Sequence, residues 1–208
     1  MSSACRLILV RHGETDWNVA RRLQGHTDIA LNERGERQAQ AVGAALAHES
    51  IDAIWSSDLA RAHRTALCIA VHHAHLTVHL EPLLRERGYG VFEGFRLDEL
   101  SEHFPSAVAD WGGDVLALAP PEGELRRDFH ERIAGALMAI TAAHAGQTVC
   151  VVAHGGVLDV AYRVASDVAF DAMRDWSIVN AGINRLTIEA GRFSLLSWGE
   201  AGHLAAVL

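Results

Sequence analysis

The sequence feature that most constrains the fold is a run of four aliphatic residues, 7–10, that ends abruptly in Arg11, His12 and Gly13. Such an all-apolar run is typical of a strand buried on both faces, as in the middle of a parallel sheet. Open α/β sheets bind ligands beyond the carboxyl ends of their strands, which is where Arg11 and His12 would lie. A glycine at this point lets the backbone turn sharply. The run therefore predicts an α/β sheet with a polar site at one edge.

The same pattern occurs a second time. Residues 148–153 are mostly apolar and lead into His154, Gly155 and Gly156. A single Arg-His-Gly sequence is better explained as an ordinary polar turn than as a site, because short motifs match by chance often. Two strand–histidine–glycine units in one small domain can bring both imidazoles to the same sheet edge. We therefore predict a site that contains His12 and His154.

The rest of the chain alternates between strand and helix patterns. Strands are predicted at 7–10, 51–55, 76–80 and 148–152, and two more in the tail, 183–198, joined by a hairpin turn around 189–192. Helices are predicted behind Asn32 as N-cap, behind Ser56, Ser57 or Asp58, and around 125–140 and 157–162. This alternation predicts an α/β fold with a mainly parallel central sheet and helices on both faces.

The length suits one domain. A chain of 208 residues that is 50% hydrophobic can build one sizeable core, and two domains would be cramped. We predict a single domain over 1–208 with an inserted cap segment at about 95–122, made of short helices and containing Trp111 and the Gly112–Gly113 break.

The charge of the chain limits its partners. A net charge of −8 argues against a general binder of nucleic acid or of an anionic membrane, while leaving room for a locally basic pocket. No apolar run approaches the length of a membrane span, and the N-terminus carries no signal pattern, so we expect a cytoplasmic protein. Cys5, Cys68 and Cys150 each sit in an apolar stretch and are expected to be reduced core thiols.

Four predicted strands end in residues suited to phosphate chemistry. Arg11 and Arg61 can bind a phosphate through their guanidinium forks and stabilise its charge during transfer. His12 can attack phosphorus, and Glu86 can supply the proton that a leaving oxygen needs. This scheme requires no metal, and the absence of a Gly-Lys-Ser phosphate loop counts against kinase or NTPase functions.

Two further polar stretches leave alternatives open. Residues 19–28, with Arg21 and Arg22, form either a binding loop or a solvated turn. The stretch 72–79 holds His72, His73 and two more histidines, which suggests a metal site, but no carboxylate or cysteine completes a ligand set. Alternation of its apolar residues instead favours a strand, with the first histidines ending the preceding helix.

Taken together, these motifs resemble the signature of the histidine phosphatase superfamily, also called the phosphoglycerate mutase-like family. The resemblance extends from about residue 6 to about residue 160. Its ordered blocks are residues 11–18, 22–28, 31–39, 56–62, 84–94, 121–124 and 154–156. The resemblance implies a phosphoglycerate mutase-like fold with a small cap over the site.

The resemblance also implies roles for individual residues. His12 would be the phosphorylated nucleophile, and Arg11, Arg61 and His154 would complete the phosphate pocket. Glu86 would be the proton donor and later the base. Further contacts with the substrate would come from Asn18, Gln24, Gly25 and Gly155. No metal or cofactor is implied.

Three features of the sequence favour hydrolysis over phosphoglycerate mutase activity within this resemblance. The chain between Gly94 and His154 is short, a second glycine follows Gly155, and Glu93 adds a carboxylate near Glu86, as in the short phosphatase branches. We therefore expect a metal-independent phosphomonoesterase that acts on a small phosphorylated metabolite, with a mutase as the alternative. A non-catalytic phospho-ligand binder would be expected to lack His12, Glu86 or His154. The natural substrate stays open.

Overall fold

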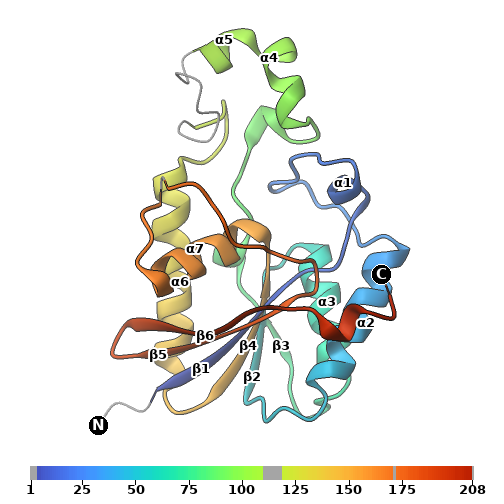
Figure 1. Ribbon diagram of the computed structural model, residues 1–208, viewed down its shortest axis with the longest axis vertical. Coiled ribbons are helices and arrows are strands. Elements are labelled where there is room, and N and C mark those ends of the chain that lie inside the picture. The colour runs from blue at the N-terminus through green and yellow to red at the C-terminus, as the bar shows by residue number, and fades with distance from the viewer. Residues whose placement is uncertain (1–3, 110–118, 171, 208) are drawn as a thin grey trace.

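The computed structural model describes residues 4–109, 119–170 and 172–207. A six-stranded sheet in the order β3-β2-β4-β1-β5-β6 forms its centre (Figure 1). The strands are β1 (Cys5–Arg11), β2 (Ala53–Ser56), β3 (Val78–Leu80), β4 (Thr148–Ala153), β5 (Ile183–Glu189) and β6 (Arg192–Glu200). Strands β1, β2, β3 and β4 run parallel to one another. Strand β5 pairs antiparallel with β1, and β6 pairs antiparallel with β5. The predicted mainly parallel sheet and the hairpin turn in the tail are confirmed.

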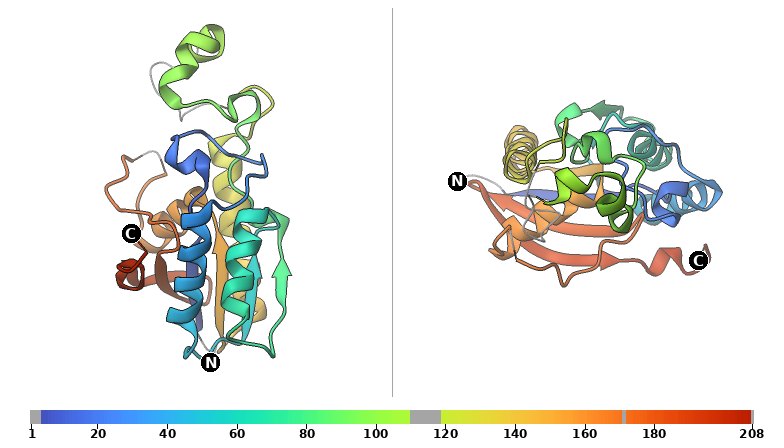
Figure 2. Two further views of the ribbon diagram at one scale, coloured as in Figure 1. Left: turned by 90° about the vertical axis from the view of Figure 1, so that its right-hand side faces the viewer. Right: turned by 90° about the horizontal axis from the view of Figure 1, so that it is seen from above.

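The apolar run of β1 lies between two helical layers. Leu7 and Leu9 pack into the core formed with α6 (Arg126–Ala143) and α7 (Gly155–Ser166). Ile8 and Val10 pack into the opposite core, with α2 (Glu33–Leu46) and α3 (Ala60–Ala70), which lie side by side in Figure 2. Because successive strand residues point to opposite faces, a strand covered on both sides must be apolar throughout. The predicted helices on both faces are confirmed.

The starts of α2 and α3 are fixed in different ways. Asn32 accepts a hydrogen bond from the Gly35 N–H at 2.8 Å, which confirms it as the N-cap of α2. The prediction of a serine or aspartate N-cap for α3 is wrong, because the N-cap is Leu59 and the Ala60 N–H donates instead to Asp28 at 2.8 Å. Asp58 is bound in an ion pair with Arg85, which lowers the pKa of Asp58.

The histidine-rich stretch 72–79 forms less strand than predicted. Strand β3 has only three residues, and Leu80 is 47% exposed. His73 contacts the Leu46 carbonyl at 3.2 Å, and the His79 ring packs against Trp55. Within the described ranges, no group of three or more histidine, cysteine, aspartate or glutamate side chains is arranged to hold a metal ion.

Short elements connect β3 to α6 at the carboxyl end of the parallel strands. They are η1 (Pro82–Leu84), η2 (Gly90–Phe92), η3 (Leu97–Glu99), α4 (Leu100–His103) and α5 (Pro105–Ala109). Helices α4 and α5 lie away from the sheet (Figures 1 and 2), where Phe92 and Leu100 form a small core of their own. Of the predicted cap segment, Trp111, Gly112 and Gly113 lie outside the described residues.

Two short elements complete the fold. Helix α1 (Asp16–Val19) follows β1, and η4 (Gly202–Leu204) packs near α2.

Cys5, Cys68 and Cys150 are free and buried, as predicted, and burial raises the pKa of the Cys150 thiol to about 12. No helix among the described residues combines the length and apolarity that a membrane span requires.

Candidate active site

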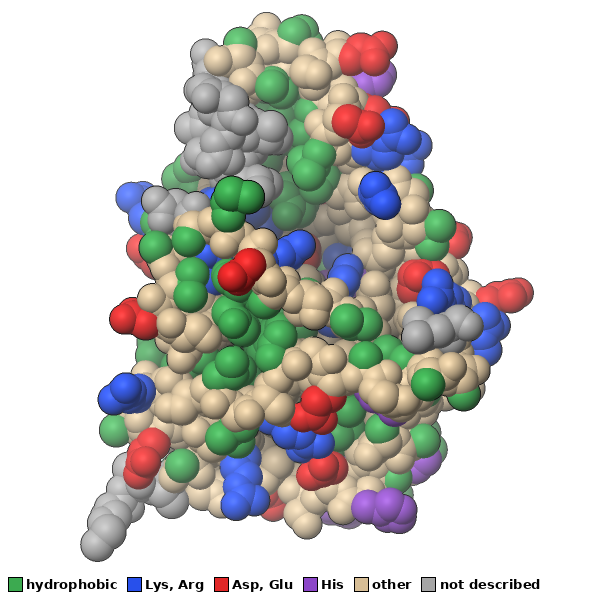
Figure 3. Space-filling model, viewed as in Figure 1, with side chains coloured by type: hydrophobic (Ala, Val, Ile, Leu, Met, Phe, Trp, Pro, Cys, Tyr) green, Lys and Arg blue, Asp and Glu red, His purple; other side chains and the backbone are tan. Residues whose placement is uncertain are grey.

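Two adjoining cavities open beyond the carboxyl ends of β1 and β4. The small cavity, of about 160 Å³, is lined by Arg11, His12, Asn18, Arg22, Leu23, Gln24, Arg61, Glu86 and Tyr89. The large cavity, of about 680 Å³, shares Arg11, Leu23, Glu86 and Tyr89 with it. Figure 3 shows the hollow in the surface with basic side chains inside it. The predicted strand ends therefore meet at one place.

His12 is held in one tautomer at the end of β1. Its Nδ1 lies 2.6 Å from the Gly13 carbonyl oxygen. Because a carbonyl oxygen only accepts hydrogen bonds, Nδ1 must carry the proton, and Nε2 keeps its lone pair. Burial lowers the pKa of His12 well below its usual value, and the charges of Arg61 and Arg11 lower it further. His12 is thus a neutral imidazole with a nucleophilic nitrogen.

His154 lies next to His12, with its ring centroid 5.2 Å away. Its Nε2 lies 2.8 Å from the Ser57 hydroxyl, and that hydroxyl oxygen accepts the Leu59 N–H at 3.3 Å. Among the described residues the Ser57 hydroxyl has no other acceptor for its own proton, so it donates to Nε2, and the ring proton of a neutral His154 resides on Nδ1. Burial, first of all, keeps the pKa of His154 well below its usual value. Nδ1 is buried without a partner in the described structure and is a free donor beside His12.

Two arginines without an acidic partner line the small cavity. Arg61 is fully buried, and its Nη1 and Nη2 donate to the carbonyls of Thr27 at 3.0 Å and Gly25 at 2.8 Å. Arg11 donates from Nη1 to the Ile178 carbonyl at 2.8 Å. The Nε of each arginine is buried and lacks a partner among the described residues. Burial lowers the pKa of Arg11 to about 10, so it is still charged at neutral pH. A buried and a half-buried guanidinium that have no acidic partner are suited to binding an anion.

Glu86 stands where the two cavities meet. Its Oε1 accepts the Arg87 N–H at 2.9 Å, and its Oε2 accepts the Gly156 N–H at 3.0 Å at the start of α7. A Cβ on residue 156 would lie 2.2 Å from Glu86 Oε1, so a side chain there would force the Glu86 carboxylate to move. The sequence analysis assigned no role to Gly156, although the Gly155–Gly156 pair was the signal that could have found it.

The predicted binding residues Asn18 and Gln24 both line the small cavity. Asn18 Oδ1 accepts hydrogen bonds from the Thr15 N–H at 3.1 Å and from Asn180 Nδ2 at 3.3 Å. Gln24 Oε1 accepts from the Thr15 hydroxyl at 3.1 Å. Because both amide oxygens are engaged, the amide nitrogens are the groups left to donate to an anion.

Three other predicted residues take different places. Gly155 lines the large cavity. His154 is fully buried and Gly25 is buried, and neither of them lines either cavity. Gly25 has φ +52°, and a Cβ there would collide with Glu93 at 1.9 Å. Gly25 therefore acts behind the site, through the carbonyl that orients Arg61.

The open question about the loop 19–28 resolves differently for its two arginines. Arg22 lines the small cavity and forms an ion pair with Glu99 at 3.5 Å. Arg21 is exposed, has φ +55° and lines neither cavity. Only Arg22 is therefore placed to meet a ligand.

Glu93 does not act as a second carboxylate beside Glu86, contrary to the sequence-based expectation. It lines neither cavity. Its carboxylate accepts the backbone N–H groups of His26, Thr27 and Tyr89 at 2.9, 2.8 and 3.0 Å. These bonds connect two parts of the chain: the loop whose carbonyls orient Arg61, and the segment that contains Glu86.

The sequence analysis missed one segment of the site, which lies between α7 and β5. The segment between α7 and β5 reaches the site through Asn180, which donates to the His12 carbonyl at 2.9 Å, and through Ile178 beside Arg11. Residues 172–174 of this segment also line the large cavity. No local motif marks these residues, because their role depends on how the segment folds back over β1.

Comparisons with known proteins identify the family of this chain. The family model of the histidine phosphatase superfamily (branch 1) matches residues 7–201. The chain is 35% identical to phosphoglycerate mutase-like protein 4 of Arabidopsis thaliana, over 95% of this chain and 86% of the relative. It is 36% identical to a metal-independent phosphoserine phosphatase of the same plant, over 99% of this chain and 86% of the relative.

A solved structure has a fold similar to that of this chain. Bacillus stearothermophilus YhfR superposes with a TM-score of 0.86 at 31% identity, covering 96% of this chain and 99% of that chain. The chain belongs to the histidine phosphatase superfamily and has its phosphoglycerate mutase-like α/β fold. Phosphatases are among its named relatives.

Proposed function

We propose that the protein is a phosphomonoesterase that hydrolyses a small phosphorylated metabolite through a phosphohistidine on His12. The observation that carries this proposal is the state of His12: a neutral ring whose Nδ1 proton is bound by the Gly13 carbonyl, at a cavity lined by Arg11 and Arg61. A phosphate held by the two guanidiniums would present its phosphorus to Nε2.

The reaction would proceed in two displacements. In the first, the Nε2 lone pair of His12 forms a bond to phosphorus while the bond to the leaving oxygen breaks, and protonated Glu86 gives its proton to that oxygen. In the second, water attacks phosphorus, Glu86 takes the proton of the water, and the nitrogen–phosphorus bond breaks. Arg11, Arg61 and the Nδ1–H of His154 would stabilise the charge on the transferred oxygens in both steps.

No metal is needed in this scheme, because the guanidiniums supply the positive charge. We also propose that the chain forms a single domain with a cap segment at about 95–122 that shapes the site. We further propose that the enzyme works in the cytoplasm. A relative whose name includes metal-independent phosphoserine phosphatase supports the absence of a metal requirement. A relative named phosphoglycerate mutase-like keeps the mutase as the second candidate.

The experiment is hydrolysis of 4-nitrophenyl phosphate by the purified protein in the presence of a chelator. We expect turnover by the wild type and none by His12→Ala, together with an acid-labile phosphoryl group trapped on the wild type only. Loss of activity with chelator and recovery with metal would refute the metal-free mechanism. To test the second candidate, 3-phosphoglycerate is supplied with a trace of 2,3-bisphosphoglycerate. Fast conversion to 2-phosphoglycerate with little free phosphate would identify a mutase.

A further inference from the structure

The large cavity holds more positive charge than the phosphate chemistry uses. Arg11 and Glu86 already serve the small cavity, and Arg163 is neutralised by Asp159 at 2.7 Å. Arg126 and Arg174 also line the cavity, and within the described residues neither forms an ion pair. Because neither of them lines the small cavity, the proposed phosphate chemistry assigns these two guanidiniums no role.

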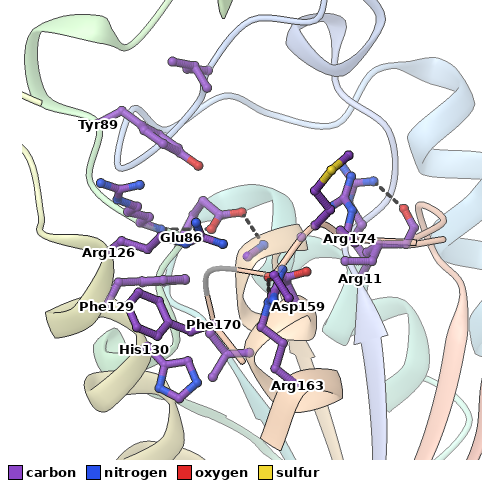
Figure 4. A pocket seen from close by; sticks show the side chains of 18 of the residues that line it. Arg11, Glu86, Tyr89, Arg126, Phe129, His130, Asp159, Arg163, Phe170 and Arg174 are labelled. Atoms are coloured by element: carbon purple, nitrogen blue, oxygen red, sulfur yellow. Dashed lines mark hydrogen bonds and ion pairs between the residues drawn. The ribbon is translucent and has the colours of Figure 1, made fainter. Parts of the chain in front are cut away.

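The two arginines reach the cavity from separate parts of the chain. Arg126 is the first residue of α6, and Arg174 comes from the segment between α7 and β5. Figure 4 shows Arg126 on the side of Phe129, Arg174 on the side of Arg11, and Glu86 between them. A group that leaves from the small cavity, protonated by Glu86, would pass into the space between these two arginines.

The surroundings of both arginines favour an anionic ligand. The charge of Arg174 contributes to lowering the pKa of Arg11, and that of Arg126 to lowering the pKa of Arg87. Five arginines thus line the large cavity against two carboxylates, those of Glu86 and Asp159, in a protein whose net charge is −8. Such an arrangement is costly in the free protein and is relieved when an anion binds.

The remaining wall suits a carbon skeleton. Phe129 is buried, and Phe170 is 44% exposed. The Arg126 guanidinium lies over the Phe170 ring, 5.7 Å from the ring centroid. Cavities of roughly 300–1,000 Å³ that combine apolar walls with a few charged groups are typical of small-molecule sites. The large cavity, at about 680 Å³, falls within this range.

We propose that the alcohol released by this enzyme is itself an anion, and that Arg126 and Arg174 bind its carboxylate or second phosphate in the large cavity. The proposal rests on the proposed phosphatase function and specifies its substrate class. In this arrangement Arg11 and Arg61 hold the scissile phosphate, and Arg126 and Arg174 hold the other end of the molecule. They select the substrate without taking part in bond breaking.

The test compares substrates that differ only in the second charge. 3-Phosphoglycerate and glycerol 3-phosphate share a skeleton and differ in a carboxylate, and fructose 1,6-bisphosphate and fructose 6-phosphate differ in a phosphate. We expect kcat/KM to be at least about tenfold higher for the charged member of at least one pair, since hydrogen bonds to charged groups contribute that much. The pair that shows the difference identifies the carboxylate or the phosphate as the bound group. Equal kcat/KM within both pairs would overturn the proposal.

The variants Arg126→Gln and Arg174→Gln should each bring the ratio within the selective pair toward one. Arg127→Gln is the matched control, because Arg127 is the next residue, is 70% exposed and lines neither cavity. It should leave the ratio as in the wild type. An unchanged ratio in both cavity variants would refute the assignment of these arginines.

A binding measurement separates this proposal from the proposed function. Calorimetry on His12→Asn, which lacks the nucleophile, gives Kd for both members of each pair without turnover. Tighter binding of the charged member, lost in Arg126→Gln and Arg174→Gln made in the same background, supports the anionic substrate even if hydrolysis fails. Hydrolysis of 4-nitrophenyl phosphate combined with equal Kd values within both pairs would refute the anionic substrate alone.

Discussion

The hydroxyl of Ser57 lies 2.8 Å from Nε2 of His154 and fixes which nitrogen of that ring carries the proton. Because no other acceptor lies within reach of that hydroxyl among the described residues, the serine proton is directed to the imidazole. The Nδ1–H of His154 is left to donate beside His12. Ser57 therefore positions a proton in the site through His154.

Ser57→Ala should lower kcat for an aryl phosphate about tenfold. The variant removes a buried hydrogen bond worth about 1 kcal/mol or more and lets His154 change tautomer. Ser57→Thr, which keeps a hydroxyl, is the comparison variant and should retain more of the activity. Steady-state kinetics and nitrogen-15 NMR of the His154 ring provide the readouts. A wild-type kcat in Ser57→Ala would show that the tautomer does not matter.

Gly156→Ala should lower kcat by tenfold or more. The added Cβ would lie 2.2 Å from Glu86 Oε1 and 2.9 Å from the Phe129 ring, so the acid must move. Gly135→Ala in α6 is the control, because its Cβ meets nothing within 4 Å. Alanine in place of that helical glycine should raise the free energy of unfolding by about 0.5–1 kcal/mol and leave kcat unchanged. Equal kcat values in the two variants would contradict the role given to Gly156.

Glu93→Gln should weaken both the stability and the activity of the protein. The carboxylate accepts three backbone N–H groups that join the loop 25–27 to Tyr89, and an amide cannot accept from all of them equally well. We expect a loss of about 1–3 kcal/mol in urea unfolding and a higher KM, because Arg61 depends on the carbonyls of that loop. Glu102→Gln, at an exposed helical position, should change neither quantity. A wild-type KM in a destabilised Glu93→Gln variant would show that the loop does not influence substrate binding.

Stability should fall as the pH drops below about 6.5. Burial and neighbouring arginines hold the pKa values of His12 and His154 below that of an exposed histidine. Between the folded and unfolded pKa values the unfolded chain binds more protons, so the free energy of unfolding rises with pH there, by up to about 1.4 kcal/mol per pH unit for each histidine. This contribution is fully present above the unfolded pKa.

Urea unfolding between pH 5 and pH 8 measures this slope. The variants His12→Asn and His154→Asn, which carry no titrating ring, should each reduce it, and the double variant should reduce it most. Retention of the full slope in the double variant would assign the pH dependence to other groups.

The local pattern of the sequence was enough to locate the sheet and one edge of the site. The apolar runs of β1 and β4 had to be buried on both faces, and parallel strands place their carboxyl ends together, so Arg11, His12 and His154 were brought together by topology alone. The strands and helices that carry them were predictable for the same reason. Within β3 the pattern was misleading, because an edge strand needs little apolar alternation and Leu80 remains exposed.

The chain on its own indicated which groups are candidates for the proposed chemistry, and the tertiary structure decided how each of them is held. His12, Glu86 and Arg61 could be proposed from the sequence, because their residue types, their places after strand ends and the family resemblance all indicated them. The proton on His154, the bonds of Glu93 and the place of Arg174 depend on loops that fold back from distant positions. Those contacts are set by burial and by hydrogen-bond satisfaction across the whole core, which a local pattern does not contain.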